Sequence, residues 1–196
     1  MISDEELLSL ITGHRYIAVA GLIGSGKTTL ATRIGKLSGA KVFFEDVDGN
    51  KFLPRYYAGH RVAFEMQMRF ISARVMQIMD ILGHLQSGGT VIQDRTIYED
   101  LAVFSNYQYR IGQMTTIQFN QISQFYSVSI RALVEPDLVI WVKTPIESIL
   151  QRIVERARPF EQEITTDFLE YLQKFYNKSF MRELKQRNIL TVSIQN

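Results

Sequence analysis

The sequence has no cysteine, so disulfide bonds and thiolate metal sites are excluded, and a reducing, cytoplasmic location is expected. It contains no run of about 18 apolar residues, and its start lacks the order of a secretory signal, so we expect neither a membrane-spanning helix nor export. The formal net charge is only +2, from 22 basic and 20 acidic side chains. This balance gives no support to a nucleic-acid surface. We therefore expect neither nucleic acid nor a membrane among its partners.

The chain also lacks repeats, linkers and low-complexity segments. With 196 residues, of which 46% are hydrophobic, it is long enough for one substantial core and short for two. We expect a single domain that covers residues 1–196.

Short apolar runs alternate with segments of helical periodicity. The runs predict strands at residues 16–20, 41–44, 90–93, 137–142 and 189–194. Apolar residues three and four apart predict helices at 27–37, 62–86, 146–157 and 166–187, a short one before Gly13, and two more between residues 100 and 134. Apolar strands that alternate with helices favour an α/β fold, a doubly wound parallel sheet of five strands flanked by helices on both faces.

What the sequence does contain is a phosphate-binding motif. Residues 21–30 read GLIGSGKTTL and fit the pattern G-x-x-x-x-G-K-[ST]. A predicted strand before the loop and a helix after it are the context that the motif requires, which disfavours a chance glycine-rich turn. Backbone N–H groups, the positive helix end and Lys27 would hold a triphosphate, and the Thr28 hydroxyl would bind Mg²⁺. Nucleotide contacts are expected from Gly21, Gly24, Ser25, Gly26, Lys27, Thr28 and Thr29.

A nucleotide site alone fits a kinase, a GTP-dependent switch or a mechanical ATPase. A switch would carry an Asn/Thr-Lys-x-Asp motif, but Asn177-Lys178 is followed by Ser179-Phe180. An ATPase driven by nucleic acid would have a basic groove with interleaved aromatics, whereas the arginine-rich segment here is short and contains glutamates. A kinase is therefore favoured, and a non-catalytic nucleotide-binding module is the alternative from a different class.

Polar residues at the ends of predicted strands indicate where a second substrate would bind, because ligands lie beyond the carboxyl ends of parallel strands. Glu45 follows the second strand, and Asp94 and Arg95 follow the third. Gln67 and Arg74 lie two turns apart on one face of the longest predicted helix. A carboxamide can match an exocyclic amine beside a ring nitrogen, the edge of both adenine and cytosine. The alternative is that both residues are polar positions at the edge of an apolar face.

Three arginines, Arg152, Arg156 and Arg158, lie just before Pro159. Their guanidinium groups could close on a transferring phosphoryl group and neutralise its charge. The alternative is a solvated helix face whose ion-pair partners are Glu147, Glu155 and Glu161.

Five motifs in order make the sequence resemble the deoxyribonucleoside kinase family from Tyr16 to the last helix. They are GLIGSGKTT; FFEDVDGNKFL, similar to F-x-E-P-V-x-x-N-x-F-L; YYAGHRVAFEMQMRFISAR; DRTIYED, similar to E/D-R-S-x-Y-x-D; and RIVERARPFE, similar to the lid R-x-x-x-R-G-R-x-x-E. The resemblance implies a P-loop kinase fold that transfers phosphate from ATP, with Mg²⁺, to the 5′-hydroxyl of a deoxynucleoside. It also implies an arginine-rich lid at residues 152–162 and a homodimer built on the helix at 62–86 and the stretch 113–134.

The same resemblance implies roles at the reacting end. Glu45 would be the general base for the 5′-hydroxyl, and Arg95 would hold that carboxylate ionised and touch the hydroxyl. Asp94 and Thr28 would bind Mg²⁺. Lys27 would stabilise the transferring phosphoryl group together with the lid residues Arg152, Arg156 and Arg158, which would also exclude water.

At the other end, the resemblance implies a nucleoside pocket lined by Tyr56, Gln67, Arg74, Asp100, Phe104 and Glu161. Gln67 would read the base edge, Asp100 would accept from the exocyclic amine, and Arg74 would pair with Asp100. Tyr56 and Glu161 would hold the sugar hydroxyls, and Phe104 would stack on the base. An ionised Asp100 facing a carbonyl would be costly, so we expect deoxyadenosine, with deoxycytidine and deoxyguanosine as alternatives.

Four positions depart from the family pattern. Asp94 stands where many members have a glutamate, and Val62 stands where a tryptophan is common. Asp46 replaces the usual proline after Glu45, and Ala157 replaces the middle glycine of the lid. Within the enzymes, the alternative function is a kinase of nucleoside monophosphates or of another small hydroxyl compound. A monophosphate acceptor would need cationic groups near Glu45, where the sequence is acidic instead.

Overall fold

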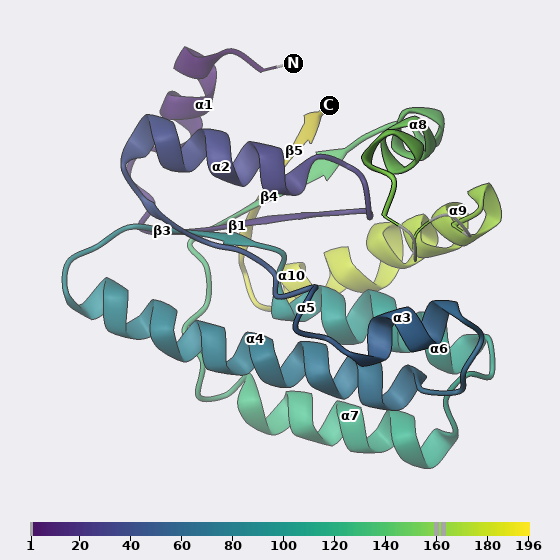
Figure 1. The fold of residues 1–196 in the computed structure, drawn as a ribbon. Helices are drawn as coiled ribbons and strands as arrows, with labels where there is room; N and C mark the ends of the chain where they lie inside the picture. The colour runs from purple at the N-terminus through teal and green to yellow at the C-terminus, as the bar shows by residue number, and fades with distance from the viewer. Residues whose placement is uncertain (1, 159–160, 162–163) are drawn as a thin grey trace.

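A computed structural model describes residues 2–158, 161 and 164–196. Its centre is one parallel sheet of five strands in the order β2-β3-β1-β4-β5 (Figure 1). The strands are β1 (Tyr16–Gly21), β2 (Lys41–Phe43), β3 (Val91–Asp94), β4 (Leu138–Lys143) and β5 (Leu190–Gln195). The predicted five-stranded parallel sheet is confirmed, although β2 ends one residue before the predicted boundary.

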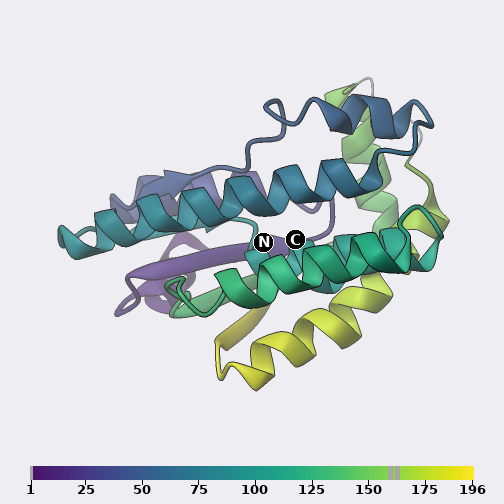
Figure 2. The same ribbon diagram turned by 90° about the horizontal axis from the view of Figure 1, so that it is seen from below.

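Helices cover both faces of the sheet. Alternate residues of each strand point to opposite faces, so apolar strands contribute side chains to a core on each face. On β1, Ile17 and Val19 pack in one core with α1 (Asp4–Ile11) and α2 (Lys27–Ser38). The intervening Ala18 and Ala20 belong to the other core, which includes α4 (Ala63–Gln86) and α7 (Thr116–Ser129). Figure 1 shows α4 and α7 below the sheet, and Figure 2, which views the protein from below, shows the two helices side by side. The remaining α-helices are α3 (Phe52–Tyr57), α5 (Ile97–Glu99), α6 (Asn106–Arg110), α8 (Ile146–Arg156), α9 (Thr166–Phe175) and α10 (Met181–Gln186).

Two helices are interrupted by π-helical segments that periodicity did not predict. The segment η1 (Asp100–Ser105) joins α5 to α6, and η3 (Tyr176–Phe180) joins α9 to α10. The predicted helix at 166–187 is therefore one helical rod with a wider turn in its middle. Such turns occur often at functional sites.

The helix α3 was missed by the sequence analysis. It is six residues long and contains Pro54 in its first turn, where a helix needs no N–H from proline. Its shortness and its proline both hide the helical pattern.

Strand order places two loops beside each other. The chain crosses from β1 to β2 at one edge, returns to β3, and then passes to β4 on the other side of β1. Val19 of β1 is in register with Asp94, the last residue of β3. The loop after β1 and the residues after β3 therefore meet where the connections change direction, which is the expected ligand position in such sheets.

No described helix combines the length and the apolar character needed to cross a membrane. The longest helix, α4, carries four charged residues, Glu65, Arg69, Arg74 and Asp80.

Candidate active site

The phosphate loop, residues 21–28, bends through left-handed backbone conformations. Gly24 and Gly26 have φ of +77° and +94°, values that favour glycine. A Cβ on Gly26 would overlap only the end of the Asn196 side chain, which can turn aside, so the left-handed backbone is what favours glycine there. Gly26 precedes α2 and has no side chain to cap it. A bound anion could therefore accept from the first-turn amides of α2.

Lys27 is the first residue of α2, and its side chain is buried at the loop. Its Nζ donates to the carbonyl oxygen of Leu22 at 2.7 Å. Burial and the nearby charge of Arg95 lower the pKa of Lys27 to about 8, although the carboxylates around it act in the opposite direction. An anionic ligand would favour the charged form.

Thr28 and Asp94 form a pair of oxygen ligands. The Thr28 hydroxyl donates to Oδ2 of Asp94 at 2.5 Å. Burial raises the pKa of Asp94, against the opposing influence of Lys27 and Thr28. The described residues contain no group of three or more His, Cys, Asp or Glu side chains that could hold a metal. One hydroxyl and one carboxylate nevertheless fit Mg²⁺, which takes its remaining ligands from phosphates and water.

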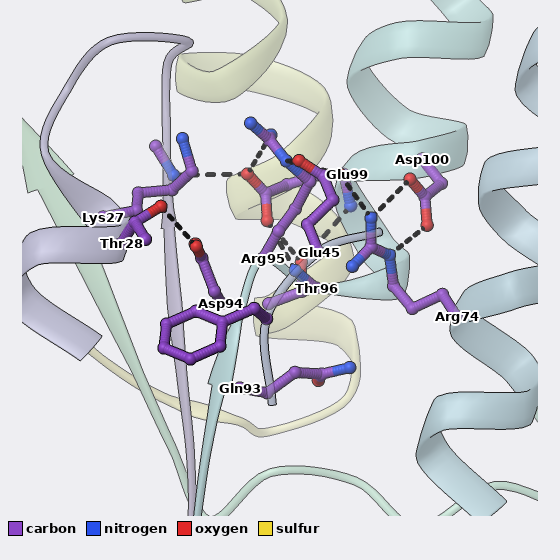
Figure 3. Close-up of polar contacts among 12 residues, drawn as sticks. Lys27, Thr28, Glu45, Arg74, Gln93, Asp94, Arg95, Thr96, Glu99 and Asp100 are labelled. Atoms are coloured by element: carbon purple, nitrogen blue, oxygen red, sulfur yellow. Dashed lines mark hydrogen bonds and ion pairs between the residues drawn. The ribbon is translucent and has the colours of Figure 1, made fainter. Parts of the chain in front are cut away.

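Glu45 lies between two arginines (Figure 3). Its Oε1 is 2.7 Å from Nη2 of Arg74 and 3.0 Å from Nε of Arg95. Burial opposes ionisation of Glu45, but the charges of Arg95, Arg74 and Lys27 outweigh it and lower the pKa to about 2. The carboxylate is therefore ionised at neutral pH.

Arg74 connects Glu45 to Asp100. Its Nε donates to Oδ2 of Asp100 at 2.6 Å, and only 3% of each side chain is exposed. Burial raises the pKa of Asp100 to about 6, although Arg74 favours its ionised form. Gln67 is also 3% exposed, so both residues are buried rather than solvated at the edge of the apolar face of α4.

Sequence analysis missed Glu99, which is fully buried behind Arg95. Its carboxylate accepts from Nη1 of Arg95 at 3.0 Å and from the N–H of Gly21 at 3.2 Å. The hydroxyl of Tyr176 lies 2.5 Å from the same oxygen. The pattern Thr-x-x-Glu at 96–99 predicts a capping box, which the structure contains, but nothing in the sequence signals the contact with Tyr176.

A cavity of about 350 Å³ collects most of the predicted residues. Its lining includes Gly24, Lys27, Thr28, Glu45, Tyr56, Gln67, Asp94, Arg95, Asp100, Phe104, Arg156, Arg158 and Glu161. Phe104 also packs under Arg95, with 4.7 Å from the guanidinium carbon to the ring centroid. The phosphate-loop residues and the polar residues after β2 and β3 therefore share one space.

The other predicted residues do not line this cavity. Arg74 is behind Glu45, while Gly21 is held by Glu99. Ser25 is buried, and its carbonyl oxygen accepts from Nη1 of Arg152 at 3.2 Å. Thr29 is exposed and lines a separate depression together with Thr28.

The predicted lid is described in part, because Pro159, Phe160 and Gln162 lie outside the described residues. Arg156 and Arg158 contact Glu161 at 2.5 Å and 3.5 Å. Glu161 is buried, whereas 35% and 42% of the two arginine side chains are exposed. Ala157 adopts a left-handed φ of +49°, the conformation for which the glycine of the family pattern is suited.

The fold and this cavity define a nucleotide-binding P-loop protein with a second polar compartment beside its phosphate site. The model of the deoxynucleoside kinase family matches residues 17–196. The chain belongs to this family, and its fold is the P-loop kinase fold.

Two relatives and one solved structure illustrate the similarity. The chain is 34% identical to the deoxyadenosine kinase of Dictyostelium discoideum over 83% of its own length and 64% of that protein, so it spans less than two thirds of this relative. It is 31% identical to the deoxyguanosine kinase of Bacillus subtilis (strain 168), over 90% and 85% of the two chains. The structure of deoxyadenosine kinase from M. mycoides with bound dCTP is 26% identical, covers 91% and 89% of the two chains, and has a TM-score of 0.76.

Proposed function

We propose that this protein is an ATP-dependent deoxynucleoside kinase that transfers the γ-phosphoryl group to the 5′-hydroxyl of a deoxynucleoside in nucleotide salvage. The observation that carries this proposal is the position of Glu45. Its ionised carboxylate lines the same cavity as Lys27 of the phosphate loop and Gln67 of α4. A hydroxyl that binds Glu45 would therefore lie between a base-sized compartment and the phosphates of a bound triphosphate.

The chemistry requires positioning and charge stabilisation rather than a covalent intermediate. Glu45 accepts the 5′-hydroxyl proton as the bond from the 5′-oxygen to the γ-phosphorus forms and the bond from that phosphorus to the bridging oxygen of the leaving ADP breaks. Arg95 keeps the carboxylate oriented. Lys27, Arg152, Arg156 and Arg158 neutralise charge on the phosphates. Thr28 and Asp94 would hold Mg²⁺, which would supply positive charge to neutralise the triphosphate.

The nucleoside end of the cavity is the basis for the proposed base preference. Gln67 and Asp100 line it, and Phe104 offers a ring face. An ionised Asp100 can accept from an exocyclic amine but repels a carbonyl oxygen, so deoxyadenosine is proposed first and deoxycytidine or deoxyguanosine next. The relatives named above act on different bases, so the base preference rests on these side chains.

The experiment is a panel of the four deoxynucleosides with ATP and Mg²⁺, scored for monophosphate formation. Deoxyadenosine should be the best substrate, and faster turnover of thymidine would overturn the base assignment.

Glu45→Gln should lower transfer by about 10²- to 10⁴-fold while ATP binding is retained. Asp46→Asn removes the adjacent, half-exposed carboxylate and serves as a matched control that should retain activity. ATP binding without transfer to any nucleoside by the unmodified protein would favour a non-catalytic module.

We also propose a homodimer through α4 and α7. Met76 and Met79 on α4 are 62% and 58% exposed, and Ile117 and Val128 on α7 are 73% and 71% exposed. Apolar groups on two adjacent helices favour burial against a second copy. Sedimentation at micromolar concentration should show a species of twice 22.6 kDa, and a purely monomeric species would refute the dimer. Met79→Glu should dissociate the dimer, whereas Val154→Glu, at a 76% exposed position on α8, should leave it intact.

A further inference from the structure

Gln108 of α6 is a buried amide with no role in the chemistry described above. It lines the cavity and is only 3% exposed. Its Nε2 donates to the hydroxyl oxygen of Tyr56 at 3.0 Å. Its Oε1 has no hydrogen-bond partner among the described residues.

A half-paired amide is a poor choice for stability alone. A buried polar atom without a partner costs free energy, and an aliphatic side chain of similar size would avoid that cost. The position therefore calls for a reason other than packing. Its contact with Tyr56 supplies one, because Tyr56 lines the same cavity.

The direction of this hydrogen bond determines what Tyr56 can do. The Tyr56 oxygen already accepts from Gln108, so its own proton must point elsewhere. No acceptor for that proton is found in the part of the chain that the structure describes. Burial raises the pKa of Tyr56, although the bond from Gln108 acts against this shift, so the phenol keeps its proton. The Tyr56 hydroxyl can therefore donate its proton to a group that is bound in the cavity.

A sugar hydroxyl matches this arrangement. Glu161 also lines the cavity and is held by Arg156 and Arg158. A hydroxyl both accepts and donates, so it can accept from Tyr56 and donate to the carboxylate of Glu161. A deoxynucleoside has two hydroxyl groups, and the 5′-hydroxyl is used at Glu45, which leaves the 3′-hydroxyl.

We propose that Gln108 is a positioning residue that directs the Tyr56 proton to the 3′-hydroxyl of the substrate, and so sets the preference for nucleosides that carry this group. This inference rests on the proposed kinase function. It assigns specificity for the sugar to a side chain that does not itself contact the reacting atoms.

The test compares two substrates with the same base, a 2′-deoxynucleoside and its 2′,3′-dideoxy analogue, by the ratio of their kcat/KM values. The unmodified protein should prefer the 3′-hydroxyl. Gln108→Leu should reduce this ratio by about tenfold, the effect of one hydrogen bond, with the KM for ATP unchanged. Its Tm should be unchanged or higher, because the unpaired amide oxygen is removed. Gln108→Met provides a second variant of similar size if the leucine variant does not fold.

A double-mutant cycle separates positioning from a general structural effect. Tyr56→Phe should also lower the ratio, and Gln108→Leu should add nothing further in that background. An equal loss for both substrates, or no preference in the unmodified protein, would overturn the role of Gln108. Failure of the kinase proposal is distinguishable, because the unmodified protein would then phosphorylate no deoxynucleoside.

Discussion

The hydroxyl of Tyr176 lies 2.5 Å from Oε1 of Glu99, a residue 77 positions earlier in the chain. The same hydroxyl is 2.7 Å from the carbonyl oxygen of Gly21, whose N–H donates to Glu99. The first residue of the phosphate loop is therefore held through both of its backbone polar groups. Because Glu99 also pairs with Arg95, this contact connects the phosphate loop to the residue beside Glu45.

Glu99→Gln should reduce both stability and transfer. The amide keeps the shape but removes the buried negative charge that faces Arg95, and loss of one partner of a buried ion pair typically costs about 3–5 kcal/mol. Thermal unfolding should show a Tm lower by several degrees, and kcat should fall because Arg95 is less firmly placed. Tyr176→Phe is the control for the hydroxyl alone and should cost less, about 1–3 kcal/mol. A Glu99→Gln variant with unchanged Tm and kcat would contradict this account.

Gln77 should matter for the placement of Glu45. A chain of side-chain hydrogen bonds runs from Tyr16 to Gln93 (2.5 Å), to Gln77 (2.8 Å) and to the carbonyl oxygen of Phe44 (2.7 Å). Since β2 ends at Phe43, no strand ladder holds the backbone next to Glu45. Gln77→Leu removes both the hydrogen bond to the Phe44 carbonyl oxygen and the one from Gln93. It should lower kcat about tenfold or more with little change in the KM for ATP, because the backbone beside Glu45 is then less firmly held.

The matched control for Gln77 is its neighbour on α4. Met76→Leu keeps an apolar side chain of similar size on the proposed dimer face and breaks no hydrogen bond, so it should leave the kinetics unchanged. Equal kcat values for the Gln77→Leu and Met76→Leu variants would show that the hydrogen-bonded chain does not position Glu45.

The rate should depend on pH through two groups. Burial, opposed by Arg74, raises the pKa of Asp100 to about 6, and the ionised form is the one that accepts from an amine. Therefore kcat/KM for deoxyadenosine should fall as pH decreases through about 6. Burial and Arg95 lower the pKa of Lys27 to about 8, so kcat/KM for ATP should fall as pH rises through about 8. Asp100→Asn cannot titrate, and persistence of the acidic limb in this variant would assign that limb to another group.

Local patterns predicted those parts of the site that depend on neighbouring residues. The phosphate loop is a contiguous motif, and the positions of Glu45 and Asp94 follow from the rule that parallel strands end at the same edge. The face shared by Gln67 and Arg74 follows from helical spacing, although spacing alone left their burial open.

Contacts between distant segments escaped prediction because no periodicity encodes them. The Gln108 amide meets Tyr56 across 52 positions of the chain. Glu99 meets Tyr176 across 77 positions, and Tyr176 is the first residue of η3. An apolar pattern does not distinguish such a π-turn from an α-turn. All four residues lie on helical segments, and the packing of these segments against one another brings them together.

Gly24→Ala and Gly39→Ala should show whether a left-handed glycine is needed for ATP binding or only for stability. Both residues have a left-handed backbone, with φ of +77° and +72°, so alanine should cost about 1–2 kcal/mol at each position and lower Tm in both variants. A Cβ on Gly39 would meet nothing within 4 Å, whereas on Gly24 it would lie 3.0 Å from Cγ2 of Ile149 and crowd the phosphate loop against α8. Calorimetry should therefore show ATP binding weakened about tenfold or more in Gly24→Ala, which corresponds to at least 1.4 kcal/mol, and unchanged in Gly39→Ala. Equal ATP affinities in the two variants would mean that the conformation of Gly24 is not needed to hold the phosphates.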